Sequence, residues 1–322
     1  MKTYFSPVIL LSMFATISRY SNPLFKTSGL DMVIDGRIET DTDLVLSAKR
    51  NIIIKDTATI EAMGSSNIIL EAGTSGNGIG SVIFEGSEPQ IFLDDGQLSI
   101  YYNPGPQNTP KYTNPKFFEE NVDKPEQVTA FMWVNNIYDL QNIRTYLAGN
   151  YALSQDIAAV PSIDNINNGK GFQPISLPHK FSPFSGHFDG RHHAIRNLKI
   201  KCGETDRKNP AFGGCGIFGR VSNGGLIENL VIDNCTIEGD HYVGILFGNA
   251  LVDEVSFRNI TLLNSSAKGN ALVGRLGGEV ISRLCIDRST LHYENTSVEA
   301  IEQHYDDALF GAPLEVPTNC SM

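Results

Sequence analysis

The chain has 322 residues and a formal net charge of −11, and 41% of its residues are hydrophobic while 19% are charged. Such a composition can bury a large core, which excludes a chain that is disordered throughout. The negative charge, which no Lys/Arg-rich run offsets, argues against nucleic acid or an anionic membrane as partner, because phosphates would be repelled.

Residues 1–30 begin with Lys2 and an apolar run at residues 7–15. This run is too short to cross a bilayer, which takes about 20 apolar residues. It resembles the apolar part of a signal peptide, although the basic flank is a single lysine and no clean Ala-x-Ala site follows. We therefore expect a signal-like or disordered N-terminus. No other segment reaches spanning length, so we expect no stable membrane insertion.

From residue 31 to 102, short apolar runs alternate with turn residues. The runs lie at residues 51–54, 67–70, 81–84, 90–93 and 97–100, and Gly73, Gly76, Gly78 and Gly80 crowd one loop. This pattern predicts a first β-solenoid block over 31–102. Residues 103–127 then hold five of the fifteen prolines. That composition predicts a Pro/Asn-rich linker.

The region 128–158 departs from the β pattern. Four apolar residues recur at helical spacing: Ile137, Leu140, Ile143 and Leu147. Asn136 stands at an N-cap position and Gly149 just past the last apolar residue. We predict an amphipathic helix over 136–148. Because a solenoid end exposes unpaired strands, we expect this helix to cap a β block.

The block at 159–298 repeats one spacing of apolar residues, with gaps of three and two. The copies are Ile195/Leu198/Ile200, Ile227/Leu230/Ile232, Val252/Val255/Phe257 and Ile281/Leu284/Ile286. Glycine-bounded apolar segments at 216–219, 244–248 and 274–278 precede the last three copies. Phe218 and Phe247 are 29 residues apart, which leaves no room for a crossover helix. This self-similarity predicts coils of a parallel β-solenoid.

Alternation within each copy places Leu230 and Ile232 on one face. Stacking the copies predicts two internal ladders: Leu230, Val255 and Leu284 in one, and Ile232, Phe257 and Ile286 in the other. For the glycines we expect corners that need a positive φ. Residues 299–322 form an acidic tail that we expect to be mobile. The fold class predicted is all-β, a right-handed parallel β-helix with one capping α-helix.

The five cysteines are Cys202, Cys215, Cys235, Cys285 and Cys320, and they show no CxxC pairing or regular spacing. Zinc and thioredoxin-like sites are therefore disfavoured. We expect buried, small apolar residues, as for Cys285 inside an apolar strand. A Cys202–Cys215 bridge is compatible with the sequence but does not follow from it.

Several segments together resemble a known family. They are residues 134–143 (VNNIYDLQNI), 147–153 (LAGNYAL), 186–190 (GHFDG), the Gly-Ile-Phe-Gly units, and upstream residues 52–54, 70–74 and 99–104. Over about residues 32–290 the chain resembles the GLUG-repeat region of filamentous haemagglutinin-type adhesins, two-partner-secretion passengers of Gram-negative bacteria. The resemblance implies a secreted right-handed β-helix that displays a binding surface and carries over no catalytic residue. No secretion domain is visible before residue 31, and Arg275 replaces a usual apolar residue, so we expect a fragment of a longer passenger.

Candidate chemistry gathers in residues 187–193, which hold His187, Asp189, Arg191, His192 and His193. A glycosidase needs two acids on one face, and this segment supplies only Asp189. Neighbouring histidines on a strand face opposite sides, which disfavours a shared metal ion. We therefore predict a turn at Asp189-Gly190, an inward-facing Phe188, and no catalytic, cofactor-binding or metal residues. The sequence lacks His-Glu-x-x-His, Gly-x-Ser-x-Gly and Walker patterns.

Five Asn-x-Ser/Thr triplets, at Asn234, Asn259, Asn264, Asn295 and Asn319, are expected by chance in so polar a chain. The leading hypothesis for function is a non-enzymatic fragment of a secreted or cell-surface bacterial adhesin. A carbohydrate-active β-helix glycosidase or lyase is one alternative, and a purely structural solenoid or degraded gene product is another. Expected partners are a host-cell glycan or receptor, and an outer-membrane transporter only if a secretion domain precedes.

Overall fold

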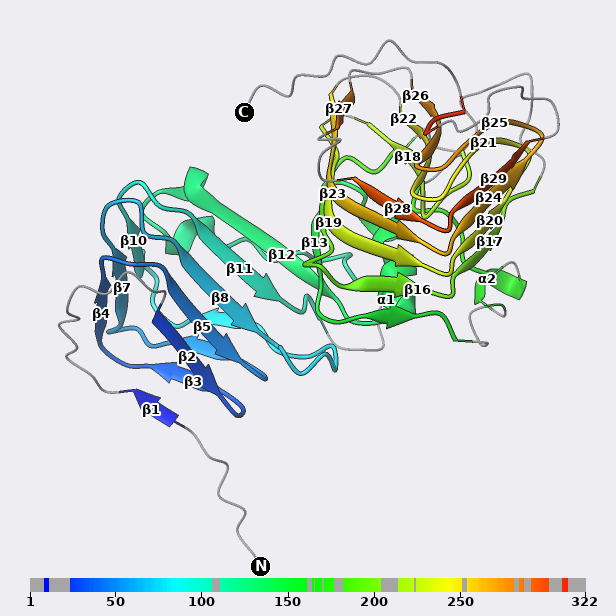
Figure 1. Ribbon diagram of the computed structural model, residues 1–322. Helices are drawn as coiled ribbons and strands as arrows, with labels where there is room; N and C mark the ends of the chain where they lie inside the picture. Colours follow the sequence, from blue (N-terminus) through cyan, green and yellow to red (C-terminus); the bar gives the residue numbers. More distant parts are fainter. Residues whose placement is uncertain are drawn as a thin grey trace, which may run out of the picture. The chain divides into compact units, whose positions relative to one another are not determined.

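A computed structural model describes residues 9–11, 24–105, 111–160, 164, 166–169, 171–176, 182–203, 214–222, 224–250, 254–280, 284–286, 291–300 and 309–311. Its contacts divide the chain into unit 1, Met1–Trp133, and unit 2, Val134–Met322. Each unit is a stack of short parallel strands (Figure 1). The all-β parallel solenoid predicted from the repeats is therefore confirmed. Right-handed winding is what the crossover rule for parallel strands predicts.

Three sheets form unit 1. The first orders β1 (Ile9–Leu11), β3 (Met32–Ile34), β6 (Ile52–Ile54) and β9 (Val82–Phe84), and the second orders β10 (Ile91–Leu93), β7 (Thr59–Ala62) and β4 (Arg37–Thr40). The third orders β2 (Leu24–Ser28), β5 (Leu44–Ala48), β8 (Ile68–Ala72), β11 (Leu98–Tyr102) and β12 (Val128–Val134). Register places Leu44, Ile68 and Leu98 in one ladder. All three are fully buried, because successive coils cover one another.

The described residues of 103–127 belong to unit 1, where the sequence predicted a linker. Tyr112 and Phe118 are buried, and the Tyr112 hydroxyl donates to the Trp133 carbonyl at 2.9 Å. Val122 forms a parallel bridge with Ile91 next to the short 3-10 helix η1 (Glu119–Asn121), and η2 (Pro125–Gln127) follows. Apolar anchors thus outweigh the proline content, and these residues act as one more turn of the solenoid.

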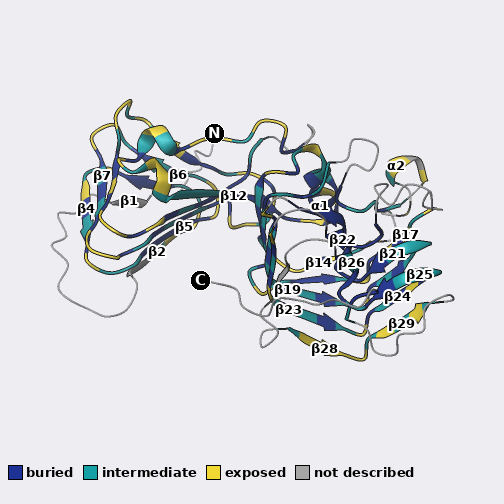
Figure 2. Cartoon of the chain, turned by 90° about the horizontal axis from the view of Figure 1, so that it is seen from above, coloured by how far each residue is buried: buried dark blue, intermediate teal, exposed yellow. Residues whose placement is uncertain are grey.

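Unit 2 also builds its coils from several sheets. The largest holds β13 (Asn150–Leu153), β14 (Ile157–Ala158), β15 (His187–Asp189), β16 (Ala194–Arg196), β19 (Leu226–Asp233), β23 (Val255–Leu263), β27 (Leu284–Ile286) and β28 (His292–Glu294). A second orders β17 (Lys199–Lys201), β20 (Thr236–Glu238), β24 (Ser266–Gly269) and β29 (Ser297–Ala300). A third orders β18 (Phe218–Val221), β22 (Phe247–Ala250) and β26 (Gly277–Val280), and β21 (His241–Gly244) pairs with β25 (Ala271–Gly274). Figure 2 shows the alternation of buried and half-buried residues along these strands.

The predicted helix begins where the sequence placed it. The Asn136 side chain accepts from the backbone of Tyr138 and Asp139, both at 2.9 Å, and α1 runs over Ile137–Asn142. It ends earlier than predicted and continues as the 3-10 helix η3 (Ile143–Thr145), still with Ile143 buried. Gln141 bonds the backbone of Gln173 on both its amide atoms, at 2.7 and 2.9 Å. The helix is thereby tied to residues 171–176, which lie beside the short helix α2 (Ile166–Gly169) and follow the edge of β18.

The predicted core ladders were partly wrong. Leu230 pairs with Ile260, and not with Val255, while Ile195 pairs with Ile232. The pairings of Val255 with Leu284 and of Phe257 with Ile286 are confirmed; Val252 and Ile281 lie outside the described residues. The reason is that one coil carries the 3-2 spacing twice, in Ile227, Leu230, Ile232, Cys235 and Ile237, all buried. A shift of five residues therefore reproduces the apolar pattern, and spacing alone cannot choose the register.

The glycine segments stack in the predicted register, but for a different reason from the one expected. Phe218 pairs with Phe247, and Phe247 with Gly277. None of the glycines at 216–219, 244–248 or 274–278 has a left-handed φ. A Cβ on Gly248 would instead lie 2.2 Å from backbone atoms of Gly214. These glycines therefore allow two backbones to touch.

The stack continues into the predicted tail. Phe310 is buried and bridges Gly277 in parallel, and the Leu309 carbonyl accepts from Leu276. Leu309-Phe310-Gly311 repeats the Leu246-Phe247-Gly248 segment and forms a further glycine unit. The mobile-tail prediction for residues 299–322 is therefore wrong for residues 299–300, which belong to β29, and for residues 309–311; its remaining residues lie outside the described part. Sequence reasoning missed this unit because the spacing from Gly277 stretches to 33 residues.

Cys202 and Cys215 form a disulfide, with Cα atoms 6.0 Å apart and a sequence separation of 13 residues. It joins the end of β17 to the coil that follows. Replacing Cys202 by Ser should lower the free energy of unfolding of unit 2 by about 3 kcal/mol. Without the bond, the unfolded chain regains the conformational entropy that closing a loop of this size had removed. Chemical denaturation with and without dithiothreitol checks this. The reductant should destabilise the wild type and leave the variant unchanged; a wild type indifferent to reductant would contradict the bridge.

Candidate functional site

The three histidines of residues 187–193 bind three different partners. His187, on β15, places Nε2 2.7 Å from Oε1 of Glu228 on β19. His193 places Nδ1 3.2 Å from Oδ1 of Asp156. His192, with a left-handed φ of 63°, lies 3.3 Å from the Asn259 amide. Among the described residues, no group of three or more His, Cys, Asp or Glu side chains is placed to hold a metal ion.

The turn between β15 and β16 lies slightly later than predicted, because Asp189 is the last residue of β15 and the His193 N–H donates to the Gly190 carbonyl at 2.8 Å, with left-handed φ at Arg191 and His192. Phe188 is fully buried, as predicted. The Asp189 carboxylate accepts from the Arg191 backbone at 2.8 Å and from the Asn229 amide at 3.0 Å. A carboxylate that accepts two donors in this way holds a turn. Asp189 thus serves the corner of its coil.

The structure brings a second carboxylate beside Asp189 that sequence reasoning did not find. Glu228 pairs with Asp189 in register on the outer face of the sheet, although the two are 39 residues apart in the chain. The hydrogen bond from His187 lowers the pKa of Glu228, and the charge of Arg258 adds to this. A general acid of a glycosidase needs a raised pKa. Glu228 therefore does not have the raised pKa of such an acid.

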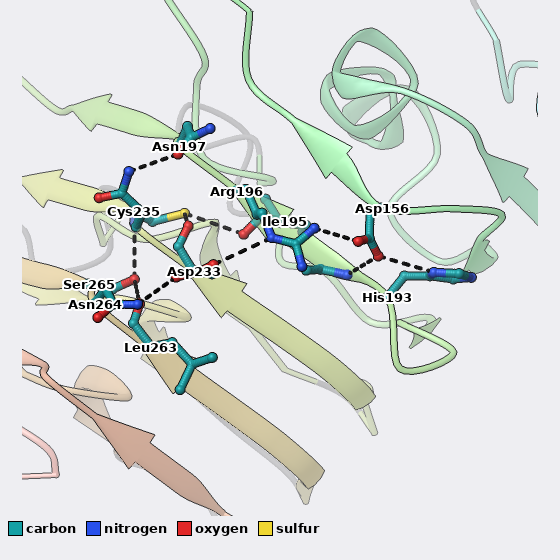
Figure 3. A network of polar contacts seen from close by, with 12 residues as sticks. Asp156, His193, Ile195, Arg196, Asn197, Asp233, Cys235, Leu263, Asn264 and Ser265 are labelled. Carbon is teal, nitrogen blue, oxygen red and sulfur yellow. Dashed lines mark hydrogen bonds and ion pairs between the residues drawn. The ribbon is translucent and has the colours of Figure 1, made fainter.

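A larger polar network continues along the same face (Figure 3). Arg196 contacts Asp156 of the preceding coil and Asp233 of the next. The Arg196 hydrogen bond lowers the pKa of Asp156 to about 2, so this carboxylate stays ionised at neutral pH. Burial raises the pKa of the nearby Cys235 thiol to about 12, which keeps it protonated and unreactive. The network therefore links three successive coils through side-chain contacts.

Asparagines with a left-handed φ lie at corners of the coils. One row is Asn197, Asn234, Asn264 and Asn295, with φ between 48° and 60°. Amide nitrogens donate from Asn234 to Asn197 at 2.8 Å and from Asn295 to Asn264 at 3.2 Å, whereas Asn264 donates to Asp233 at 2.9 Å. Asparagine tolerates this backbone better than other side chains do. Because Ser or Thr begins the next strand, most Asn-x-Ser/Thr triplets arise from this corner, whereas Asn319 lies outside the described residues.

A further row of polar residues, two of them buried and one half-buried, was not foreseen from the sequence. Arg220, Asn249 and Glu279 stack in register on β18, β22 and β26. Arg220 Nε donates to Asn249 Oδ1 at 3.2 Å, and Asn249 is fully buried. Burial raises the pKa of Glu279, whose Oε2 has no hydrogen-bond partner among the described residues. Their common place directly after the last glycine of each segment (Gly219, Gly248 and Gly278) was the only sequence signal.

Replacing Glu279 by Gln should stabilise unit 2 at pH 8 by roughly 1 kcal/mol, because a half-buried charge is removed. The native pKa lies above that of the unfolded chain. The carboxyl therefore favours folding most below about pH 4.3, and this contribution is lost as the pH rises through the native pKa. Urea denaturation from pH 4 to 8 checks this. A constant difference between the variant and the wild type would contradict it.

No protein-family model matches the chain, and no solved structure matches it. Among curated proteins, Halomucin of Haloquadratum walsbyi (strain DSM 16790 / HBSQ001) is 31% identical over 159 residues. The matched region covers 48% of this chain and 2% of Halomucin, so the chain spans a small fraction of that relative. In the described part of the chain, no helix has the length and apolar character needed to cross a membrane.

Proposed function

We propose that the chain is a non-enzymatic, secreted or cell-surface β-solenoid that displays a binding surface, as a filamentous haemagglutinin-like adhesin passenger does. The observation that carries the proposal is that polar side chains on the outer face of β15, β16 and β19 are held in place by hydrogen bonds. There His187, His193 and Asp189 are all engaged in contacts between coils. Side chains held in this way stiffen a surface, and a stiff polar surface suits many distributed weak contacts.

Two further observations support a location outside the cell. The Cys202–Cys215 disulfide is a type of bond that persists in oxidising compartments. The match to a protein named Halomucin is compatible with a surface or secreted setting. The resemblance to the GLUG-repeat region adds the expectation of a glycan or receptor as ligand.

Binding to a glycan array and to cultured cells, run beside a polysaccharide-cleavage screen with and without calcium, tests the proposal. We expect binding without cleavage. Alanine at Asp189, His192 and His193 together should leave binding within about twofold, because distributed contacts do not depend on one cluster. Circular dichroism must first show that the variant folds. Polysaccharide turnover that is lost in the triple variant would overturn the proposal.

The Asp189–Glu228 pair favours one rival, a carbohydrate-active enzyme, because two carboxylates do share the outer face. Glu228→Gln separates the two functions. An enzyme using this pair would lose at least about a hundredfold in rate, the usual contribution of a general acid or base. A binding surface should keep its affinity within about twofold. Ser256→Ala, at a half-buried outward position of β23, serves as the matched control.

A further inference from the structure

The exposed corner asparagines at residues 197, 234, 264 and 295, which we call the corner row, carry a second pattern. Three of them are followed, two residues later, by a residue with a hydroxyl group. The pairs are Asn234 with Thr236, Asn264 with Ser266, and Asn295 with Ser297. Asn197 makes the same corner with a φ of 60°, yet Lys199 stands two residues on. A left-handed corner therefore accounts for the asparagine but not for the hydroxyl.

The structure places the three hydroxyl residues in one outward ladder. Thr236, Ser266 and Ser297 begin β20, β24 and β29, and they pair in register from coil to coil (Figure 1). The next residue of β20, Ile237, is fully buried, so the alternation along the strand turns Thr236 outward. Each asparagine and its hydroxyl residue thus lie together on the outer surface, and the next pair lies one coil further on.

In the described part of the chain, each of the three corner amides donates one of its two Nδ2 hydrogens and leaves the other in solvent. Asn234 donates to Asn197 Oδ1 at 2.8 Å, and Asn295 donates to Asn264 Oδ1 at 3.2 Å. Asn264 donates to Asp233 Oδ1 at 2.9 Å. The three donors are exposed, so a substituent can replace the second hydrogen while these contacts remain.

The segment Asn259-Ile260-Thr261 has the same motif in a different setting. Asn259 is half-buried at another corner, with a φ of 50°. Its Nδ2 donates to Asn229 Oδ1 at 3.0 Å and lies 3.3 Å from His192 Nδ1. A substituent on this nitrogen would break a contact between coils. The motif alone therefore does not separate Asn259 from the corner row, but the position of the amide does.

We propose that Asn234, Asn264 and Asn295 are acceptor sites for N-linked glycans and that folded Asn259 is not. The donor is an oligosaccharide carried on a polyprenyl diphosphate. The asparagine Nδ2 forms a bond to C1 of the first sugar and loses one proton. The bond between C1 and the phosphate oxygen breaks, and the polyprenyl diphosphate leaves with the electron pair. The inference rests on the extracellular location in the proposed function, because this donor is membrane-bound and meets exported chains.

Neighbouring coils limit how many glycans one molecule carries. Adjacent strands lie about 4.8 Å apart, so sugars on neighbouring corners crowd each other. We therefore expect partial occupancy of the three sites, with Asn234 and Asn295, which are two coils apart, the easiest pair to modify together.

Glycosylation of the folded full-length chain tests the choice of sites. The chain is incubated with a single-subunit oligosaccharyltransferase that accepts Asn-x-Ser/Thr, together with its lipid-linked oligosaccharide. Release with peptide N-glycosidase in isotopically labelled water, followed by mass spectrometry, measures the occupancy of each asparagine. Occupancy at Asn234 and Asn295 should exceed that at Asn259 by at least about tenfold, because modification of Asn259 costs a hydrogen bond. Equal occupancy, or none in the corner row, would overturn the proposal.

Synthetic peptides spanning each site are the matched control. In the peptide, Asn259 should be modified as readily as the others, since no contact between coils holds its amide. Thr236→Ala and Ser297→Ala remove the motif and keep each asparagine with its hydrogen bond. Each should abolish the glycan at its own site, and thermal melting should be unchanged. Glycan that persists in these variants would contradict the assigned sites.

The chain isolated from the cells that produce it gives the final test. We expect a glycan on at least one member of the corner row and an unmodified Asn259. Unmodified asparagine at residues 234, 264 and 295 would overturn the proposal. The binding and cleavage assays of the proposed function use the unglycosylated chain, so their failure is distinguishable from the absence of glycans.

Discussion

Replacing Leu230 by Asp is expected to lower the free energy of unfolding of unit 2 by roughly 3–5 kcal/mol, since it buries an unpaired charge. Leu230 is 1% exposed on β19 and pairs with Ile260 of the next coil, also 1% exposed. Neighbouring coils close over this site from both sides, so water cannot reach the carboxylate. Urea denaturation followed by circular dichroism measures the loss.

Val231 provides the matched control, because it is the next residue along β19 and faces outward. Val231→Asp should cost about 1 kcal/mol or less, as a half-exposed charge remains hydrated. Equal losses in the two variants would contradict the inward and outward alternation. A Leu230→Asp protein with near-normal stability would contradict the burial of this ladder.

Replacing Gly248 by Ala is the second change with a large expected effect, a loss of roughly 2–4 kcal/mol from overpacking. The added Cβ would lie 2.2 Å from Cα and carbonyl carbon of Gly214 and 2.3 Å from the Cys215 nitrogen. These neighbours are backbone atoms of an adjacent coil, which cannot swing aside as a long side chain does. The stack has to open at this point.

Gly203→Ala is the control for Gly248→Ala within the same unit. A Cβ at Gly203 meets nothing within 4 Å and the residue has no left-handed φ. Alanine there should be neutral or raise stability by about 0.5 kcal/mol, because it reduces the freedom of the unfolded chain. Thermal melting of the two variants tests this, and Gly248→Ala should melt at a clearly lower temperature than Gly203→Ala. Similar melting temperatures would show that the glycine segments tolerate a side chain.

The sequence by itself determined the class of fold and several local features. Alternation along residues 229–233 correctly assigned Leu230 to the core, and the 29-residue step from Phe218 to Phe247 matches their pairing. The start of α1 followed from Asn136, since an N-cap acts through the backbone two and three residues on. These features depend on neighbours in the chain, or on a spacing long enough to be unambiguous.

The candidate site was only half visible in the sequence. Asp189-Gly190 predicted a turn, because an aspartate before glycine favours a local turn, and the turn centres one to two residues later, on Arg191 and His192. Glu228 carried no such signal, although it meets Asp189 across the sheet and takes a hydrogen bond from His187. Contacts between coils join residues about 30 or 40 positions apart, and they exist only once the register has been chosen.

Only the tertiary structure decided that register. The 3-2 spacing occurs twice in one coil, so apolar burial is equally satisfied when a neighbour shifts by five residues. Corner asparagines such as Asn234, and the backbone contact at Gly248, fit only one alignment. The tertiary structure also decided the burial of Phe118 and Val122, because the proline content of residues 103–127 had predicted a linker there. Hydrophobic periodicity fixes which side of a strand is buried, whereas directional hydrogen bonds and close backbone contacts fix which coil residues lie side by side.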